Sequence, residues 1–109
     1  MGNGNYDHGK RLSDTQRMHA ILTEMNGHAI EGRYSEIRKL HKETYVPNYD
    51  EIATRDVSLA ADLQHVRARI DRNVSHKCPD IRKSKAKVVE GLLSRLLEGI
   101  GVGHVSAQA

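Results

Sequence analysis

The seven histidines and the single cysteine are the residues best suited to metal or thiol chemistry. Imidazole and thiolate are common zinc ligands, but a site needs several of them close together. No two histidines are three or four residues apart, and His76 and Cys78 have no second thiol or histidine pair nearby. We therefore expect no metal site and no cofactor.

Catalytic patterns are also missing from the sequence. A reactive thiol needs a lowered pKa and a neighbouring base, and the proximity of Cys78 to His76 and Lys77 is common by chance. Asp14 and residues 50–51 stand at expected exposed helix starts, where carboxylates complement the helix dipole. The glycines follow neither Walker nor dinucleotide spacing. We expect a protein that is not an enzyme and has no small-molecule substrate.

Positive charge is concentrated between residues 65 and 87, where eight Lys and Arg face two Asp, a local net charge of +6. The block spans the end of one expected helix, a loop and the start of the next, so a helical hairpin would gather these charges at one end. A focused positive patch attracts phosphates or an acidic protein surface, although a solvated helix face has the same composition. The candidate binding residues are Arg67, Arg69, Arg72, Lys77, Arg82, Lys83, Lys85 and Lys87.

Near the end of the chain, apolar residues form a helical stripe two residues wide, broader than one neighbouring helix requires. This helix is either the centre of a three- or four-helix core, or part of its stripe lies at an interface such as a twofold dimer. A core without Phe or Trp would gain from the extra burial of a dimer. The stripe consists of Val88, Val89, Leu92, Leu93, Leu96, Leu97 and Ile100.

Residues 48–53 open like a DNA-binding helix-turn-helix, with a polar cap followed by Glu-Ile-Ala. The motif then needs an apolar residue and a turn residue three and four positions past the alanine, and Asp56 and Val57 supply neither. A DNA-binding motif is therefore only a secondary hypothesis for this segment.

Helical periodicity and capping signals predict the elements before residue 47. A first helix is expected from Ser13 to a turn at residues 26–27, and a second over residues 30–45, ended by Pro47. Gly27 and Gly32 are weak breaks, so one bent helix over residues 14–44 is the alternative.

The second half of the chain predicts two more helices. Asn48 is expected to cap a helix that continues to about residue 72, with residues 56–58 as its weak point. Residues 73–79 are predicted to be a loop, and Asp80 is predicted to cap the last helix.

The fold class predicted from these patterns is all-α, a small bundle of three to five helices. Residues 1–12 are expected to be a flexible, disordered arm, 13–101 a single helical domain and 102–109 a frayed tail. No apolar run approaches the roughly 20 residues that span a bilayer. Without an apolar signal segment either, we expect a cytoplasmic protein that does not bind membranes.

Together these features predict a small regulatory or adaptor protein that acts by protein-protein association, as a homodimer whose basic region binds an acidic partner. The alternative is a nucleic-acid-binding regulator in which the same lysines and arginines contact phosphates.

Overall fold

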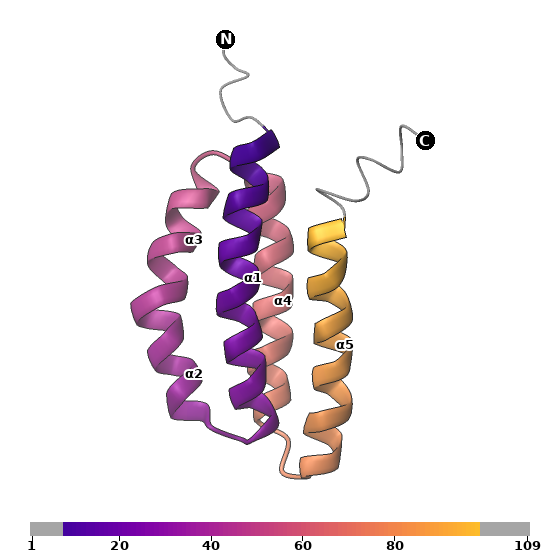
Figure 1. The fold of residues 1–109 in the computed structure, drawn as a ribbon. Coiled ribbons are helices and arrows are strands. Elements are labelled where there is room, and N and C mark those ends of the chain that lie inside the picture. Colours follow the sequence, from indigo (N-terminus) through magenta and orange to yellow (C-terminus); the bar gives the residue numbers. More distant parts are fainter. Residues whose placement is uncertain (1–7, 99–109) are drawn as a thin grey trace.

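The computed structural model describes residues 8–98, which form an all-α bundle and confirm the predicted fold class (Figure 1). Residues 1–7 and 99–109 lie outside the described part, and with them most of the predicted arm, the predicted tail and Ile100. The elements are α1 (His8–Ile30), α2 (Tyr34–Leu40), the π-helix η1 (His41–Tyr45), α3 (Val46–Ala53), α4 (Val57–Val74) and α5 (Pro79–Leu97). Because α2, η1 and α3 are continuous, the described residues make four helices. No described helix has the length and apolar character needed to cross a membrane.

The bundle is flattened, with α1 and α4 in the middle (Figure 1). The helix formed by α2, η1 and α3 lies on one side of this central pair, and α5 lies on the other. Accordingly α1 packs against all the other helices, whereas α5 packs against α1 and α4. The leucine-rich α5 is thus an edge helix, and α1 is the central helix of the core.

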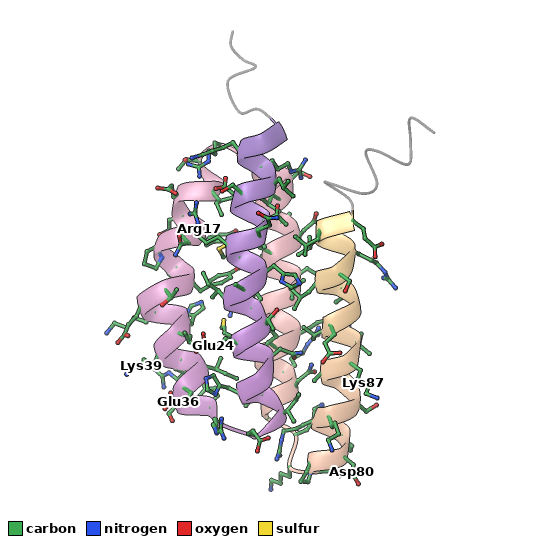
Figure 2. All side chains as sticks on the ribbon, in the orientation of Figure 1. Arg17, Glu24, Glu36, Lys39, Asp80 and Lys87 are labelled. Atoms are coloured by element: carbon green, nitrogen blue, oxygen red, sulfur yellow. The ribbon has the colours of Figure 1, made fainter. Side chains whose placement is uncertain are left out.

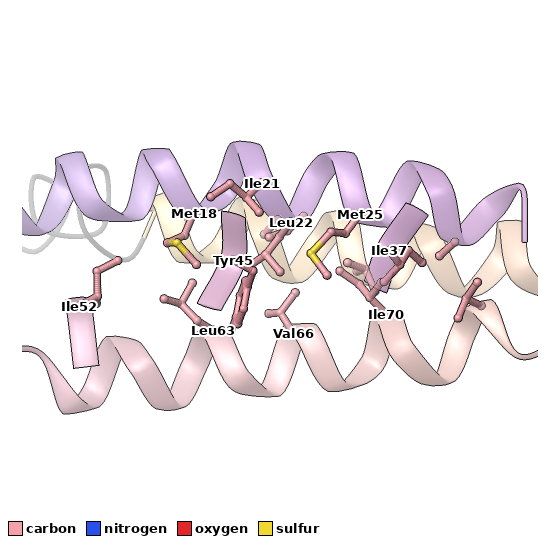
Figure 3. Close-up of a cluster of buried hydrophobic side chains, with 14 of the residues drawn as sticks. Met18, Ile21, Leu22, Met25, Ile37, Tyr45, Ile52, Leu63, Val66 and Ile70 are labelled. Atoms are coloured by element: carbon pink, nitrogen blue, oxygen red, sulfur yellow. The ribbon is translucent and has the colours of Figure 1, made fainter. Parts of the chain in front are cut away.

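The core lies between the facing sides of α1 and α4 (Figure 3). Met18, Leu22 and Met25 of α1 recur at helical spacing and are fully buried, opposite Leu63 and Ile70 of α4. Each fully buried aliphatic side chain contributes about 1.5–3 kcal/mol to folding. The continuous helix formed by α2, η1 and α3 adds Ile37, Tyr45 and Ile52 to this core.

The start of α1 differs from the prediction, because the helix begins at His8 and not at Ser13. Arg11 anchors the additional turn, since its Nε lies 2.9 Å from Oδ2 of Asp56. The Thr15 hydroxyl also donates to the Arg11 carbonyl within the helix. Residues 8–12 have a composition typical of a disordered arm, yet they are helical because Arg11 contacts Asp56, which is distant in the sequence.

The end of α1 also differs, because the helix continues through Gly27 to Ile30. Asn26 does not form a turn: its side-chain amide is buried and donates to the Ala86 carbonyl of α5 at 3.0 Å. The reversal occurs at Gly32, whose φ of +71° lies in the left-handed region that glycine adopts readily.

Gly32→Ala is expected to lower the free energy of unfolding by about 1–2 kcal/mol, because a Cβ there is strained by the backbone and would lie 3.2 Å from the Arg82 guanidinium. Gly27→Ala is the control. It lies within α1 with nothing within 4 Å of its Cβ position, so this change should raise stability by about 0.5–1 kcal/mol. Chemical denaturation measures the free energy of unfolding of both variants. A change of the same sign in both would contradict the assignment of the turn to Gly32.

The predicted helix end at Pro47 is wrong, because Pro47 lies in the first turn of α3, which continues directly from the π turn η1. The Val46 amide donates to the His41 carbonyl, five residues back. A proline ring in a regular α-helix collides with the carbonyl four residues earlier, and the wider π turn shifts the preceding carbonyls. Asn48 is consequently inside the helix and donates to the Thr44 carbonyl at 2.7 Å.

The predicted continuous helix from Asn48 to residue 72 is also wrong, because the chain turns at residues 54–56. Asp56 is the N-cap of α4, and its carboxylate accepts a hydrogen bond from the Leu59 amide at 3.0 Å. Such caps contribute about 1 kcal/mol, and the ion pair with Arg11 holds this one in place.

The loop predicted over residues 73–79 is shorter in the structure. Asn73 and Val74 are buried and extend α4 by a partial turn. Next, α5 begins at Pro79, since proline is favoured at the first helical position. Asp80 lies in the first turn of α5 and is not its cap.

Candidate anion-binding site

The predicted basic block surrounds the α4–α5 connection, at the end of the bundle that also holds the α1–α2 turn (Figure 1). We call this the basic end. Its lysines and arginines outnumber the carboxylates of Glu31, Glu36, Glu43, Asp71 and Asp80 there. The cations of the basic end are Arg33, Arg38, Lys39, Lys42, Arg67, Arg69, Arg72, Lys77, Arg82, Lys83, Lys85 and Lys87.

Arg82 does not belong to a free binding surface, because its guanidinium is bound to backbone carbonyls. Its Nε donates to the Ile30 carbonyl at the end of α1 at 3.1 Å, and its Nη1 donates to the His76 carbonyl at 2.6 Å. Arg82 thereby ties α1 to the α4–α5 connection, which is a structural role.

Three other predicted residues come together in a groove between α4 and α5. Arg69, Arg72 and Lys85 line a space of about 360 Å³ together with Asn73, His76 and Val88. No carboxylate lines this groove. Lys77, Lys83 and Lys87 are exposed and lie outside it. In Figure 2, Lys87 on α5 and Lys39 on α2 mark opposite sides of the bundle.

A larger basic groove lies on the opposite flank of α4, between that helix and the α2–η1 segment. We call it the α2–α4 groove; its volume is about 860 Å³. Of the predicted block it contains Arg67 alone. Its lining residues are Tyr34, Ile37, Arg38, Lys39, His41, Lys42, Arg67, Asp71, Val74 and Ser75.

Sequence reasoning missed Arg38, Lys39 and Lys42 as candidate residues. They lie between Glu36 and Glu43, so the local net charge of their segment is small. A helical plot would show that residues 38 and 42 share a face, one turn apart. Their proximity to Arg67 depends on how α2 packs, which no local pattern specifies.

Arg67 is held between a carboxylate and an aromatic ring at the wall of the α2–α4 groove. It forms an ion pair with Asp71, one turn later on α4. Its guanidinium carbon also lies 6.0 Å from the centre of the Tyr45 ring. Tyr45 stacks in turn on His41 and Tyr49, each with a ring separation of 5.5 Å. These contacts fix the direction of the Arg67 side chain.

The environment of Tyr45 is unusual, because the ring is 1 % exposed and its buried hydroxyl has no hydrogen-bond partner that satisfies normal geometry. Burial raises the pKa of Tyr45 well above its ordinary value, although the nearby Arg67 opposes this rise. The phenol therefore stays neutral. A buried hydroxyl without a partner costs about 1–3 kcal/mol.

His41 lines the same groove, and burial lowers its pKa below the ordinary value of 6.5. The positive charge of Arg67 lowers it further, while Asp71 opposes the shift. Because the folded state binds the proton less readily than the unfolded state, His41 favours folding above pH 6.5, and this contribution is lost as the pH falls through its folded-state pKa.

We therefore expect the free energy of unfolding to decrease between pH 7 and pH 5, and to decrease less in His41→Gln. Urea denaturation at several pH values tests this, with His19→Gln, on α1, as the control. Identical acid dependence in the unmodified protein and His41→Gln would contradict the assignment.

At the opposite end of the bundle, ion pairs join three arginines, Arg11, Arg17 and Arg55, to carboxylates. Asp14, expected at an exposed helix start, is fully buried and accepts hydrogen bonds from Arg55 at 2.9–3.1 Å. Arg17 approaches the same carboxylate at 3.3 Å, and Arg11 pairs with Asp56. The polar groups at this end are therefore used for stability.

The cations of the basic end differ, since most are exposed and do not pair with a carboxylate. Within residues 8–98 the structure shows no ion pair for Arg38, Lys39, Lys42, Arg69, Arg72, Lys77, Lys83, Lys85 or Lys87. The two ends thus differ in how their cations are used. Arg11, Arg17 and Arg55 are paired at one end, where the exposed Arg95 shows no ion pair, whereas at the basic end Arg67 alone is paired with a carboxylate among the described residues.

The apolar stripe of α5 has three kinds of position. Val89 and Leu93 are core residues, and Leu92 and Leu96 are partly buried against that core. These last two line a further groove of about 320 Å³ with Leu59, Val66 and several charged side chains of α1, α4 and α5. Leu97 is half-buried, and Val88 is 52 % exposed. The stripe is wide because α5 packs against both α1 and α4.

Cys78 is an exposed free thiol. No group of three or more His, Cys, Asp or Glu residues that could hold a metal occurs among residues 8–98. The turn at residues 54–56 does join two helices, as in a helix-turn-helix. However, the N-terminal part of α4 carries acidic residues, with Asp56 as its N-cap and Asp62 in its second turn, and the arginines of α4 lie in the second half of that helix.

The protein is therefore an all-α helical bundle, and one end of its described part is predominantly basic. Comparison with protein-family models, with curated proteins and with solved structures finds no match for the chain.

Proposed function

We propose that this protein is a non-enzymatic, cytoplasmic regulatory or adaptor protein that binds an acidic protein partner through its basic end. The observation that carries the proposal is the difference in ion pairing between the two ends of the bundle. Arg11, Arg17 and Arg55 form ion pairs, whereas the exposed cations of the basic end have no carboxylate partner among the described residues. Unpaired like charges repel one another in the free protein, and an anionic partner would relieve that cost.

We further propose that the protein is a homodimer, with the outer side of α5 as the interface. As an edge helix α5 packs on α1 and α4, and it carries the exposed residues Ile81 and Val88. Leu92, Leu96 and Leu97 are only partly buried beside them. Pairing two such surfaces about a twofold axis would cover this apolar area.

The second candidate function is nucleic-acid binding, and the α4–α5 groove favours it. Arg69, Arg72 and Lys85 line that groove without a carboxylate, an environment suited to phosphates. Binding to duplex DNA by this route would weaken linearly on a logarithmic salt scale, because each phosphate contact releases condensed counterions.

Size-exclusion chromatography with light scattering tests these proposals on the full chain, at low and moderate salt, alone and with polyglutamate or a 20-base-pair duplex. A dimer that binds polyglutamate and ignores the duplex supports the adaptor function. A duplex complex that dissociates steeply with salt supports the second candidate. Binding to neither probe would refute both, and a monomeric mass would refute the dimer alone.

A further inference from the structure

We propose that the α2–α4 groove is the docking site for an acidic amphipathic helix of the partner, which would place carboxylates against Arg38, Lys39 and Lys42 and apolar side chains against Tyr34. This inference rests on the proposed function and assigns it to one groove of the basic end. The two walls are α2–η1 and the second half of α4, which run in opposite directions (Figure 1).

The dimensions of the groove fit a short helix. Its lining residues extend from Tyr34 to Lys42 on one wall and from Arg67 to Ser75 on the other. At a rise of about 1.5 Å per residue, each wall is about 12 Å long. The groove therefore accepts roughly two turns of a partner helix, for which one face presents three or four side chains.

The charges of the groove favour carboxylates. Arg38, Lys39 and Lys42 line the α2–η1 wall, and Arg67 lines the α4 wall. Asp71 is the single carboxylate among the lining residues and is already paired with Arg67. The cations open to a partner carboxylate are therefore those of the α2–η1 wall, and Glu residues along one edge of an apolar stripe would meet them.

The groove also has an accessible apolar surface, which an amphipathic helix would cover. Ile37 and Val74 line the groove but are only 1 % and 6 % exposed, so the Tyr34 ring, at 56 % exposed, supplies most of this surface. One face of that ring is covered by Arg38, whose guanidinium carbon lies 5.8 Å from its centre. A leucine side chain could pack on the other face of this ring, whereas a nucleic acid would have to stack a base there, so the test below includes a single strand.

Irregular features of the fold also cluster at this groove. His41 and Lys42 belong to the π turn, a feature that is frequent at functional sites. Tyr45 belongs to the same turn, and its buried ring stacks on His41. The irregular backbone that accommodates Pro47 thus also carries two of the residues that line the groove.

The test uses fluorescence anisotropy with a labelled synthetic helix of 12 residues that carries Glu along one edge of a Leu stripe. The groove variant is Arg38→Glu/Lys42→Glu, and the matched control is Lys83→Glu/Lys87→Glu. Both change the net charge equally at exposed positions, but the second pair lines none of the grooves described above. Circular dichroism of each variant verifies that it remains folded.

We expect at least a tenfold increase in Kd for the groove variant and less than a twofold change for the control. A peptide with Ser in place of Leu should bind several-fold more weakly to the unmodified protein, and Tyr34→Ser should reproduce that loss. Equal losses in both charge variants would overturn the docking site while leaving the proposed function intact.

Two other outcomes separate the remaining possibilities. Tighter binding of a 20-nucleotide single strand than of the peptide, lost in the groove variant, would overturn the proposal because the occupant is then a nucleic acid. If the unmodified chain binds neither the peptide nor polyglutamate, the docking site and the proposed function both fail.

Discussion

Arg55→Met is expected to lower the free energy of unfolding by about 3–5 kcal/mol, because it leaves a buried carboxylate without its main partner. Asp14 is 0 % exposed, and Arg55 donates to both of its oxygens at 2.9–3.1 Å. Burial lowers the pKa of Arg55, but the hydrogen bonds and charges of Asp14 and Glu51 outweigh burial and raise it. Arg17, at 3.3 Å, remains beside Asp14 in the variant. Urea denaturation at pH 7 measures the loss.

The double variant Asp14→Leu/Arg55→Met is the control for this prediction. Removing both charges leaves no uncompensated carboxylate, so the double variant should be more stable than Arg55→Met alone. Neighbouring charged groups of this kind couple by about 0.5–3 kcal/mol in double-mutant cycles. Additive effects of the two substitutions would show that Asp14 does not depend on Arg55.

Leu93→Asp is expected to reduce stability by more than about 4 kcal/mol, and so to unfold most of the protein, because it buries an unpaired charge. Leu93 is 2 % exposed and belongs to the central core cluster. Thermal denaturation followed by circular dichroism measures the effect. An unchanged melting curve and mass would exclude Leu93 from both the core and an interface.

Val88→Asp on the same helix separates folding from association. Because Val88 is 52 % exposed, the substitution should change stability by no more than about 0.5 kcal/mol. If the outer side of α5 is the dimer interface, light scattering should show monomers with an unchanged far-UV spectrum. A folded dimer would place the interface elsewhere.

Element type could be predicted from the sequence, since apolar residues at helical spacing identify each helix that the structure contains. The boundaries could not, because contacts between distant residues decide them. Gly27 is a helix breaker in isolation, yet the neighbouring Asn26 bonds to the Ala86 carbonyl of α5, and the helix continues. Pro47 is tolerated because a π turn precedes it, a feature without a recognisable sequence signature.

The basic end could be predicted only in part, for a related reason. A charge count along the chain finds Arg69, Arg72 and Lys85, which do lie together. It assigns Arg82 to the same surface, although the carbonyl of Ile30 binds that guanidinium. It overlooks Arg38 and the cations beside it, which reach the α4 surface only after α2 has packed.

The pairing of α1 with α5 brings together the most distant described helices of the chain, and this has a consequence for the folding reaction. Asn26 meets Ala86 across 60 residues and Arg82 meets Ile30 across 52, so closing these loops costs more entropy than pairing helices that are adjacent in the sequence. Helices adjacent in the sequence should consequently associate first, and docking of α5 should complete the reaction. Until α5 docks, the apolar sides of α1 and α4 that it covers in the native bundle face solvent. Docking of α5 is therefore the step at which refolding competes with aggregation.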